Sequence, residues 1–297
     1  MPKLQDLAGK VAVITGAGSG FGRELARLAV QRGMKVVLAD VQADALEAVQ
    51  SELTTQGAEV LALRTDVSKG DQVAALATAT MQRFGAVHLL FNNAGVGAGG
   101  LLWENTLADW EWVLGVNLWG VVHGVRAFTP LMLEQMNQDP EYAGYIVNSA
   151  SIAGLLSPPN MGVYNVSKHA VVTLSETLYH DLQLVGARIG VSVLCPAFVP
   201  TGIAHSHRNR PSELANPAPP TASQRAAQAQ TQKAVESGQL TAVQVAQLTF
   251  TAITEGRFYI LTHPKIVSSV ALRLEDIMQQ RNPSDPFAHK PSAKPKL

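Results

Sequence analysis

Short apolar runs alternate along the chain with longer segments whose apolar residues recur at helical spacing. The runs at 10–15, 35–40, 60–66, 87–92, 144–149, 190–195 and 258–261 are typical of buried strands. Helices are predicted over 20–32, 42–54, 69–84, 107–135 and 161–184, the fourth with a bend. Strands without polar alternation are buried on both faces, and alternating strands and helices favour a parallel sheet covered on both sides. We therefore expect a doubly wound α/β fold of about seven strands in a single domain over residues 1–297.

Two segments depart from this pattern. Residues 203–240 are rich in alanine, glutamine and proline. We expect a substrate lid there, because long inserts in compact domains are often functional, with a short helix at 222–236. Residues 282–297 contain four prolines and no apolar periodicity. We expect this tail to be an extended arm that packs on a neighbour or frays.

Charge and composition narrow the function classes. The chain has 297 residues, 46% of them apolar, and its 23 basic residues balance 23 acidic ones. A neutral chain lacks the long-range attraction that nucleic acid and anionic lipid require. Cys195 is the only cysteine. It excludes an intrachain disulfide and is interpreted as a core residue. With no signal peptide and no run near the roughly 18 apolar residues of a membrane helix, we expect a cytoplasmic protein.

A glycine-rich turn links the first strand to the first helix. Gly16, Ser19, Gly20, Phe21 and Gly22 belong to this turn, TGAGSGFG at 15–22. Such a turn lets the backbone approach a pyrophosphate, and the following helix directs free N–H groups at it. The spacing is not G-x-G-x-x-G, because Phe21 occupies the last glycine position. A plain turn is the alternative.

Several polar residues end strands, at the edge where such folds bind ligands. Asp40 can accept hydrogen bonds from both adenosine ribose hydroxyls and would repel a 2′-phosphate, so NAD is favoured over NADP. A helix N-cap is the alternative, and Arg23 and Arg64 are cations that could favour NADP. Four more residues are candidates for binding the cofactor. Asp66 and Val67 could contact its adenine, and Asn93 and Gly95 follow the fourth strand. Each of them also suits an ordinary turn.

Candidate catalytic residues follow the fifth strand. Tyr164 and Lys168 lie one helical turn apart, so the ammonium, with a positive nicotinamide ring, would lower the tyrosine pKa toward the range useful for proton transfer. Ser151 or Ser149 can bind the same substrate oxygen, and strand alternation does not separate them. Asn117 lies in an apolar helix, where a buried amide needs partners.

The order of these motifs resembles the short-chain dehydrogenase/reductase family, in its compact Rossmann-like form, over residues 8–202. The matching segments are TGAGSGFG at 15–22, Asp40, Asp66 and Val67, NNAG at 92–95, VNLWG at 116–120, IVNSAS at 146–151, YNVSK at 164–168 and PAFVPT at 196–201. Phe21 and Ala197 stand where Ile or Leu and Gly are usual.

The resemblance implies roles for several residues in and near these matching segments. Tyr164 would be the general acid/base, Lys168 would lower its pKa and hold the nicotinamide ribose, and Ser151 rather than Ser149 would polarise the substrate carbonyl. Asn117 would position a water behind Lys168. Pro196, Val199 and Thr201 would meet the carboxamide end of the cofactor.

These roles predict an NAD-dependent oxidoreductase acting on a secondary alcohol or ketone. The substrate should be hydrophobic or aromatic, because the expected pocket walls are apolar: Val96–Leu101, Ile152–Met161 with Leu155, Leu156 and Met161, Phe198, the lid and Trp103. In the lid, Arg208 and Arg210 could bind a carboxylate, although a solvated loop is the expected setting. His205 and His207 are also expected in solvent, with no metal.

Two other functions are disfavoured by the sequence, and an oligomer is expected. A non-catalytic NAD sensor or scaffold is disfavoured by the complete set of catalytic candidates. A sugar-nucleotide epimerase is disfavoured because only about 95 residues follow residue 202. The helices at 107–135 and 161–184 are apolar nearly all round, so a homodimer or homotetramer through them is expected.

Overall fold

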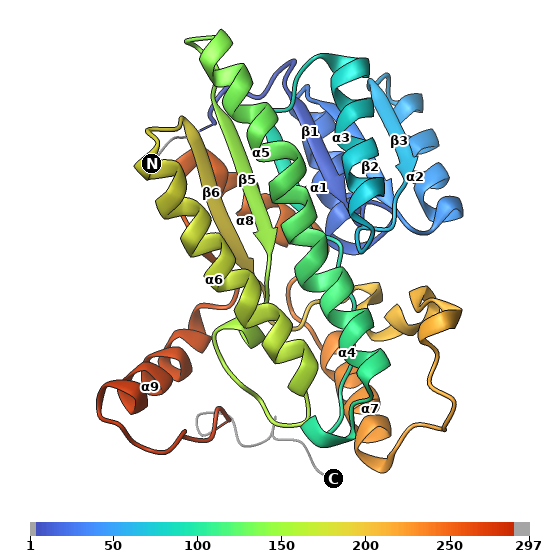
Figure 1. Cartoon of the computed structure of the whole chain (residues 1–297), viewed down its shortest axis with the longest axis vertical. Coiled ribbons are helices and arrows are strands. Elements are labelled where there is room, and N and C mark those ends of the chain that lie inside the picture. Colours follow the sequence, from blue (N-terminus) through green and yellow to red (C-terminus); the bar gives the residue numbers. More distant parts are fainter. Residues whose placement is uncertain (1–3, 288–297) are drawn as a thin grey trace.

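A parallel sheet of seven strands forms the centre of the molecule in the computed structural model, which describes residues 4–287 (Figure 1). The strand order is β3-β2-β1-β4-β5-β6-β7, so the chain reverses direction across the sheet between β1 and β4. The strands are β1 Val11–Thr15, β2 Lys35–Asp40, β3 Val60–Arg64, β4 Leu89–Asn92, β5 Gly144–Ser149, β6 Ile189–Cys195 and β7 Tyr259–Leu261. The predicted doubly wound fold is confirmed.

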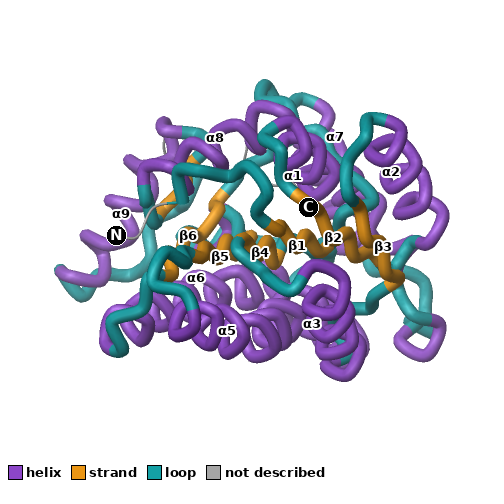
Figure 2. The backbone as a smooth tube through the Cα atoms, turned by 90° about the horizontal axis from the view of Figure 1, so that it is seen from above, coloured by secondary structure: helices purple, strands orange, loops and turns teal. Residues whose placement is uncertain are grey.

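Helices cover both faces of the sheet (Figure 2). In this view α3, α5 and α6 lie on one side, and α1, α2 and α8 on the other. The helices are α1 Gly20–Gln31, α2 Ala43–Thr55, α3 Gly70–Phe84, α4 Leu107–Leu114, α5 Gly120–Gln138, α6 Gly162–Leu184, α7 Ala222–Glu236, α8 Ala242–Glu255 and α9 Val267–Met278. Because each face is covered, successive strand residues such as Val13 and Ile14 enter different core clusters, and both are fully buried.

The helix predicted with a bend over 107–135 is helical from residue 107 to residue 138, with an irregular turn in its middle. A π-helical turn, Gly115–Trp119, separates α4 from α5, and the Gly120 N–H bonds the Gly115 carbonyl five residues back. Asn117, whose side chain is fully buried, lies in this turn. π-helical turns often occur at functional sites, where they redirect a side chain.

The predicted lid is more ordered than its composition indicates. Two 3-10 turns, Gly202–Asn209 and Ser212–Leu214, precede α7, and a capping box formed by Thr221 and Gln224 begins that helix. These segments lie beside the carboxyl ends of the strands (Figure 1).

The C-terminal region begins with α9, which projects from the body of the molecule (Figure 1). Only part of the predicted tail falls within the described residues, and its residues 282–287 form neither helix nor strand. The Ser284 N–H donates to Asp276 Oδ2 on α9 at 2.8 Å. The rest of the tail lies outside the described residues. No helix in the described part of the chain has both the length and the apolar character needed to span a membrane.

Candidate active site

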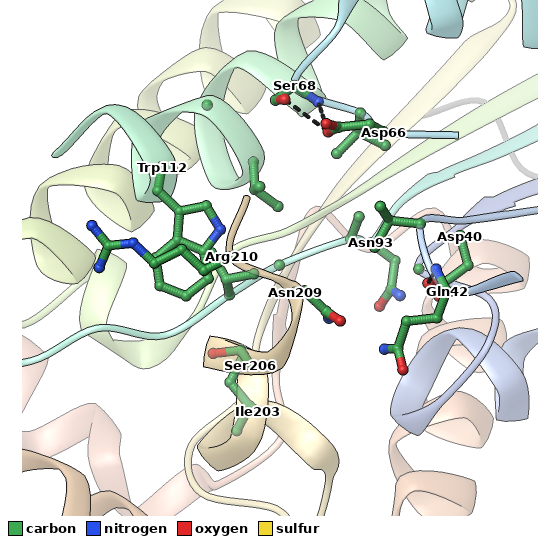
Figure 3. A pocket seen from close by; sticks show the side chains of 18 of the residues that line it. Asp40, Gln42, Asp66, Ser68, Asn93, Trp112, Ile203, Ser206, Asn209 and Arg210 are labelled. Carbon is green, nitrogen blue, oxygen red and sulfur yellow. Dashed lines mark hydrogen bonds between the residues drawn. The ribbon is translucent and has the colours of Figure 1, made fainter. Parts of the chain in front are cut away.

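A cleft of about 1010 Å³ opens at the carboxyl ends of the strands. This volume lies at the upper end of the range of small-molecule sites, roughly 300–1,000 Å³. Lid residues such as Ile203 and Asn209 face Asn93 and Asp40 across it (Figure 3). The predicted cofactor residues that line this cleft are Gly16, Ser19, Gly20, Phe21, Asp40, Asp66, Val67, Asn93, Gly95, Tyr164, Lys168, Pro196 and Thr201.

Two predicted cofactor residues lie behind this lining. A Cβ on Gly22 would overlap the Gly16 carbonyl, so this glycine allows α1 to pack against the turn before it. Val199 is buried and packs in the core with its side chain. Both residues therefore support the walls of the cleft.

The turn before α1 is built to receive an anion. Gly16 and Gly20 have positive φ values of 67° and 53°, which glycine adopts without strain. Ser19 is the N-cap of α1 but its side chain makes no capping hydrogen bond, and the first turn of the helix carries no acidic residue. The N–H groups at this end, together with the helix dipole, suit the pyrophosphate of a dinucleotide.

Asp40 joins this turn to the start of α2. Its Oδ2 accepts from the Gly18 N–H at 2.8 Å, and its Oδ1 accepts from the Gln42 N–H at 2.9 Å. Gln42, not Asp40, is the N-cap of α2, so the capping alternative does not describe this carboxylate. Each oxygen retains lone-pair capacity toward the cleft, which suits ribose hydroxyls. Arg64 lies opposite Asp40 in the register of β2 and β3.

Polar side chains fix the other strand ends around the cleft. The Asn93 amide donates to the Thr15 carbonyl at 2.9 Å, tying the segment after β4 to β1. Asp66 Oδ1 accepts from the Ser68 N–H and hydroxyl, at 3.0 and 2.7 Å (Figure 3). A Cβ on Gly95 would lie 3.6 Å from Lys168 Nζ, so the absence of a side chain keeps the floor of the cleft open.

Tyr164 and Ser151, which were predicted to bind the same substrate oxygen, lie close together. The Ser151 hydroxyl donates to the Pro196 carbonyl at 3.3 Å, and its Oγ caps the 3-10 turn Ile152–Gly154 by accepting from the Ala153 N–H at 3.1 Å. Ser149 instead directs its hydroxyl to Asn93 Oδ1 at 3.3 Å. β5 ends at Ser149, so strand alternation does not extend to Ser151. The turn beyond the strand therefore separates the two serines.

The ammonium of Lys168 lies at the floor of the cleft. Its Nζ donates to the Ser149 carbonyl at 2.8 Å and lies 5.7 Å from the centre of the Tyr164 ring. Burial lowers the pKa of Lys168 to about 8. Burial also raises the pKa of Tyr164, although the nearby Ser151 side chain opposes the rise. The sequence predicted a lowered pKa for Tyr164, whereas in the chain alone burial raises it. The prediction also counted the positive nicotinamide ring, a charge that the chain itself does not supply.

Asn117 is bound on all sides by protein groups. Its Oδ1 accepts from the Val96 N–H at 2.8 Å, while its Nδ2 donates to the Val96 carbonyl at 3.0 Å and to Ser167 Oγ at 3.1 Å. The π-helical turn thus fixes the segment after Gly95 against α6, next to Lys168.

A second, smaller pocket of about 60 Å³ adjoins the cleft at Tyr164. Helix α7 closes it: a Cβ on Gly99 would overlap Ala227, and one on Gly100 would lie 2.7 Å from Gln224 Cγ. The lining residues are Gly97, Ala98, Gly99, Met161, Tyr164, Phe198, Ile203, Ala204, Ala227, Gln228, Thr231 and Val235.

The sequence predicted only part of this lining. Trp103, which is 79% exposed, Leu155, which packs in an apolar cluster with residues of α6 and β6, and the buried Leu156 do not line the small pocket. The side chains from α7 belong to the lid, which was predicted as a pocket wall, but the individual residues were not singled out. Their signal was the match of a glycine-rich stretch at 97–100 with an alanine-rich one at 226–229.

The two lid arginines have different settings. Arg210 pairs with Asp109 at 2.5 Å, donates to the Leu214 carbonyl and lies 5.2 Å from the Trp112 ring centre. The prediction that Arg210 lies in a solvated loop is therefore wrong. The pair anchors the first part of the lid to α4, and the pKa of Asp109 is lowered by Arg210 and neighbouring donors, which outweigh its burial. Arg208 is exposed and lines the cleft. Within residues 4–287, no three His, Cys, Asp or Glu residues are arranged to hold a metal.

Comparisons with known proteins agree with this geometry. The family model for short chain dehydrogenases matches residues 10–212. A crystal structure of a short chain dehydrogenase/reductase from Burkholderia phymatum in complex with NAD is 61% identical, with a TM-score of 0.93, over 96% of this chain and all of that one.

Two curated relatives are more distant. A CLA biosynthesis dehydrogenase/reductase from Lactiplantibacillus plantarum is 35% identical over 94% of this chain and 97% of its own length. A C alpha-dehydrogenase from Sphingobium is 35% identical over 71% of this chain and 67% of its own. These relatives are dehydrogenases and reductases, so the sensor and epimerase alternatives are not favoured. The chain belongs to the short-chain dehydrogenase/reductase family, and it is an oxidoreductase of that family.

Proposed function

We propose that this protein is an NAD-dependent oxidoreductase that interconverts a secondary alcohol and a ketone, with Tyr164 as its acid/base. One observation carries the proposal: Tyr164 lines both the cofactor cleft and the small apolar pocket. A group at that junction can reach a substrate oxygen while the reacting carbon faces the cleft. NAD, when bound, supplies the hydride acceptor or donor at nicotinamide C4.

The residues around Tyr164 manage the proton and the substrate oxygen. In reduction, the Tyr164 hydroxyl gives its proton to the carbonyl oxygen, and in oxidation the same oxygen receives the alcohol proton. The Ser151 hydroxyl donates a hydrogen bond to the substrate oxygen and stabilises its developing negative charge. The Lys168 ammonium, 5.7 Å from the tyrosine ring centre, favours the ionised phenol. Asn117 holds the adjoining backbone in place.

NAD is the proposed cofactor rather than NADP. Asp40 lies at the end of β2 beside the glycine turn, where its carboxylate can accept from ribose hydroxyls and repel a 2′-phosphate. The relative from Burkholderia phymatum is described in complex with NAD. Arg64, across the strand pair, is the residue that would favour NADP.

The substrate is proposed to be uncharged and hydrophobic or aromatic. The small pocket carries no charged side chain, and its polar members are Gln228, Thr231 and the tyrosine itself. The Gln228 amide already donates to the Ala204 carbonyl. Phe198 lines the same pocket and is 40% exposed. We therefore expect the part of a larger substrate that does not fit in the pocket to extend along this ring into solvent.

A homodimer or homotetramer is proposed from exposed apolar residues on the helices. Trp119, before α5, is 51% exposed, and Val166 on α6 is 46% exposed. Light scattering should give a multiple of the chain mass, and a monomer at micromolar concentration would contradict this.

The proposal is tested by following NADH absorbance with a panel of secondary alcohols and ketones. Wild-type protein and the Tyr179→Phe control, which changes another tyrosine of α6, should turn over apolar members of the panel. Tyr164→Phe should bind NADH and turn over almost none. If wild type and Tyr164→Phe bind NADH equally and neither turns over any member, the NAD-sensor alternative replaces the enzymatic one.

A further inference from the structure

The first part of the lid, residues 202–214, runs along the mouth of the cofactor cleft, and within it Ile203 and Ala204 also line the small pocket. Ser206, Arg208, Asn209 and Leu214 line the cleft, and none of them lines the small pocket. Ser206 attaches this part to the loop after β4, because its Oγ accepts from the Gly97 N–H at 2.9 Å. The segment is therefore placed to contact the dinucleotide.

The glycine turn lacks a positive charge for the pyrophosphate. Residues 15–22 contain no lysine or arginine. Arg23, the next residue, pairs with Glu24 at 3.2 Å. Two phosphate charges would thus be met there only by backbone N–H groups and the helix dipole, which leaves room for a cation supplied from elsewhere.

Arg208 lies where such a cation is needed. A Cβ on Gly20, at the first turn of α1, would lie 3.4 Å from Thr201 atoms, so the lid begins against the phosphate turn. A Cβ on Gly202, the next residue, would lie 3.0 Å from Arg208 Nη2. The Arg208 guanidinium therefore lies near the N-terminus of α1, with only Thr201 and Gly202 between them.

The other side of the same guanidinium reaches the adenosine side of the cleft. Its Nε donates to Gln42 Oε1 at 3.3 Å, and the Gln42 N–H bonds Asp40 Oδ1. Arg208 thus spans the cleft mouth between the phosphate turn and the proposed ribose anchor.

The Arg208 fork is also available. Within the described residues its Nη groups have no hydrogen-bond acceptor and it forms no ion pair, whereas Arg210 is paired with Asp109. Lys168 is directed to the Ser149 carbonyl at the floor of the cleft. A planar guanidinium with free N–H groups matches two phosphate oxygens.

We infer that Arg208 is a cofactor-binding residue of the lid, which closes over the dinucleotide and binds its pyrophosphate. The inference rests on the proposed NAD-dependent function. A 2′-phosphate would offer the same chemistry, but Arg64 is the cation opposite Asp40 in the strand register, so Arg208 is assigned to the pyrophosphate.

The test is direct binding, measured by titration calorimetry with NADH, NADPH, ADP and adenosine. Arg208→Gln should weaken NADH and ADP about tenfold and leave adenosine unchanged, because a charge-assisted hydrogen bond is lost only with the phosphates. Arg208→Lys should retain part of the affinity. Arg225→Gln removes an exposed arginine of α7 and the same charge, and should match wild type.

Several results would overturn the inference. These are wild-type NADH affinity in Arg208→Gln, a loss confined to NADPH, or an equal loss for adenosine, which would indicate a displaced lid. Arg64→Gln provides the comparison for the 2′-phosphate. The two proposals fail separately: binding that depends on Arg208 without turnover contradicts only the oxidoreductase, and turnover with unchanged Arg208→Gln binding contradicts only the inference.

Discussion

The cofactor cleft and the apolar pocket share Tyr164 but are built from different parts of the chain. Strand ends and backbone groups form most of the cleft, with the turn at 15–22 and Asp40 held by local hydrogen bonds. The pocket is closed by α7, a helix that lies beyond the 10–212 segment matched by the family model. The cleft is thus formed mainly by strand ends, with the first part of the lid along its mouth, whereas the pocket depends on α7, which can vary without disturbing the sheet.

The largest expected effect falls on the residue that both regions share. Tyr164→Phe should lower kcat about 1,000-fold, since general acid/base groups contribute roughly 10²–10⁴-fold. The Kd for NADH should stay within about twofold, because only the hydroxyl is lost. Stopped-flow kinetics and NADH titration measure the two quantities, with Tyr179→Phe as the matched control. If Tyr164→Phe retained a tenth of wild-type turnover, Tyr164 would not be the acid/base of the reaction.

The cleft differs from the pocket in carrying a buried charge. The pKa of Lys168 is about 8 in the folded protein and 10.5 ordinarily, so between these values the unfolded chain holds a proton that the folded chain has released. Stability from this group therefore rises with pH from 8 to 10.5, and below pH 8 the buried charge costs about 3 kcal/mol.

Lys168→Met should consequently be more stable than wild type at pH 7, and this advantage should shrink as the pH approaches 10.5. Urea unfolding at several pH values measures it, and other titrating groups cancel in the difference. Lys233→Met on the exposed face of α7 is the control. An advantage that does not change with pH would show that Lys168 is not the group responsible.

Asp40 should affect the cleft alone. Asp40→Ala removes an acceptor for the ribose hydroxyls and should raise the Kd of NADH roughly thirtyfold, as expected for hydrogen bonds to a charged group. NADPH should bind relatively better, because a negative charge is removed near its 2′-phosphate. Titration with both cofactors gives the ratio. An unchanged ratio would contradict the role of Asp40 in choosing between them.

Ala227 should affect the pocket alone, with the smallest effect of the series. Ala227→Leu adds bulk where the Ala227 side chain already meets Gly99, and should lower kcat/KM for alcohols about tenfold, within the range of overpacking costs. Its Kd for NADH should not change. Ala229→Leu, on the exposed side of the same helix, is the control. If Ala227→Leu weakened NADH binding, the claim that the pocket and the cofactor cleft act independently would be contradicted.

How well the sequence predicted the molecule follows the same division. Buried strands and strand-end residues such as Asp40 and Asn93 were found because their environment is set by local periodicity and by parallel topology. A bend was predicted in the helix at 107–135, but its π-helical form at Gly115–Trp119 was not, since that form depends on the partners of Asn117 in the loop after β4 and in α6. The lid was predicted as a pocket wall, but which α7 residues face the pocket depends on long-range packing of small side chains, which periodicity does not record.

The central claim is that a substrate oxygen meets Tyr164 where the cleft joins the pocket. A crystal structure with NADH and an unreactive ketone analogue tests it most directly. The account predicts the analogue oxygen within about 2.6–3.2 Å of Tyr164 Oη and hydrogen-bonded to Ser151 Oγ, with its apolar part under α7. An oxygen bound away from Tyr164, with the tyrosine hydroxyl directed elsewhere, would contradict the account.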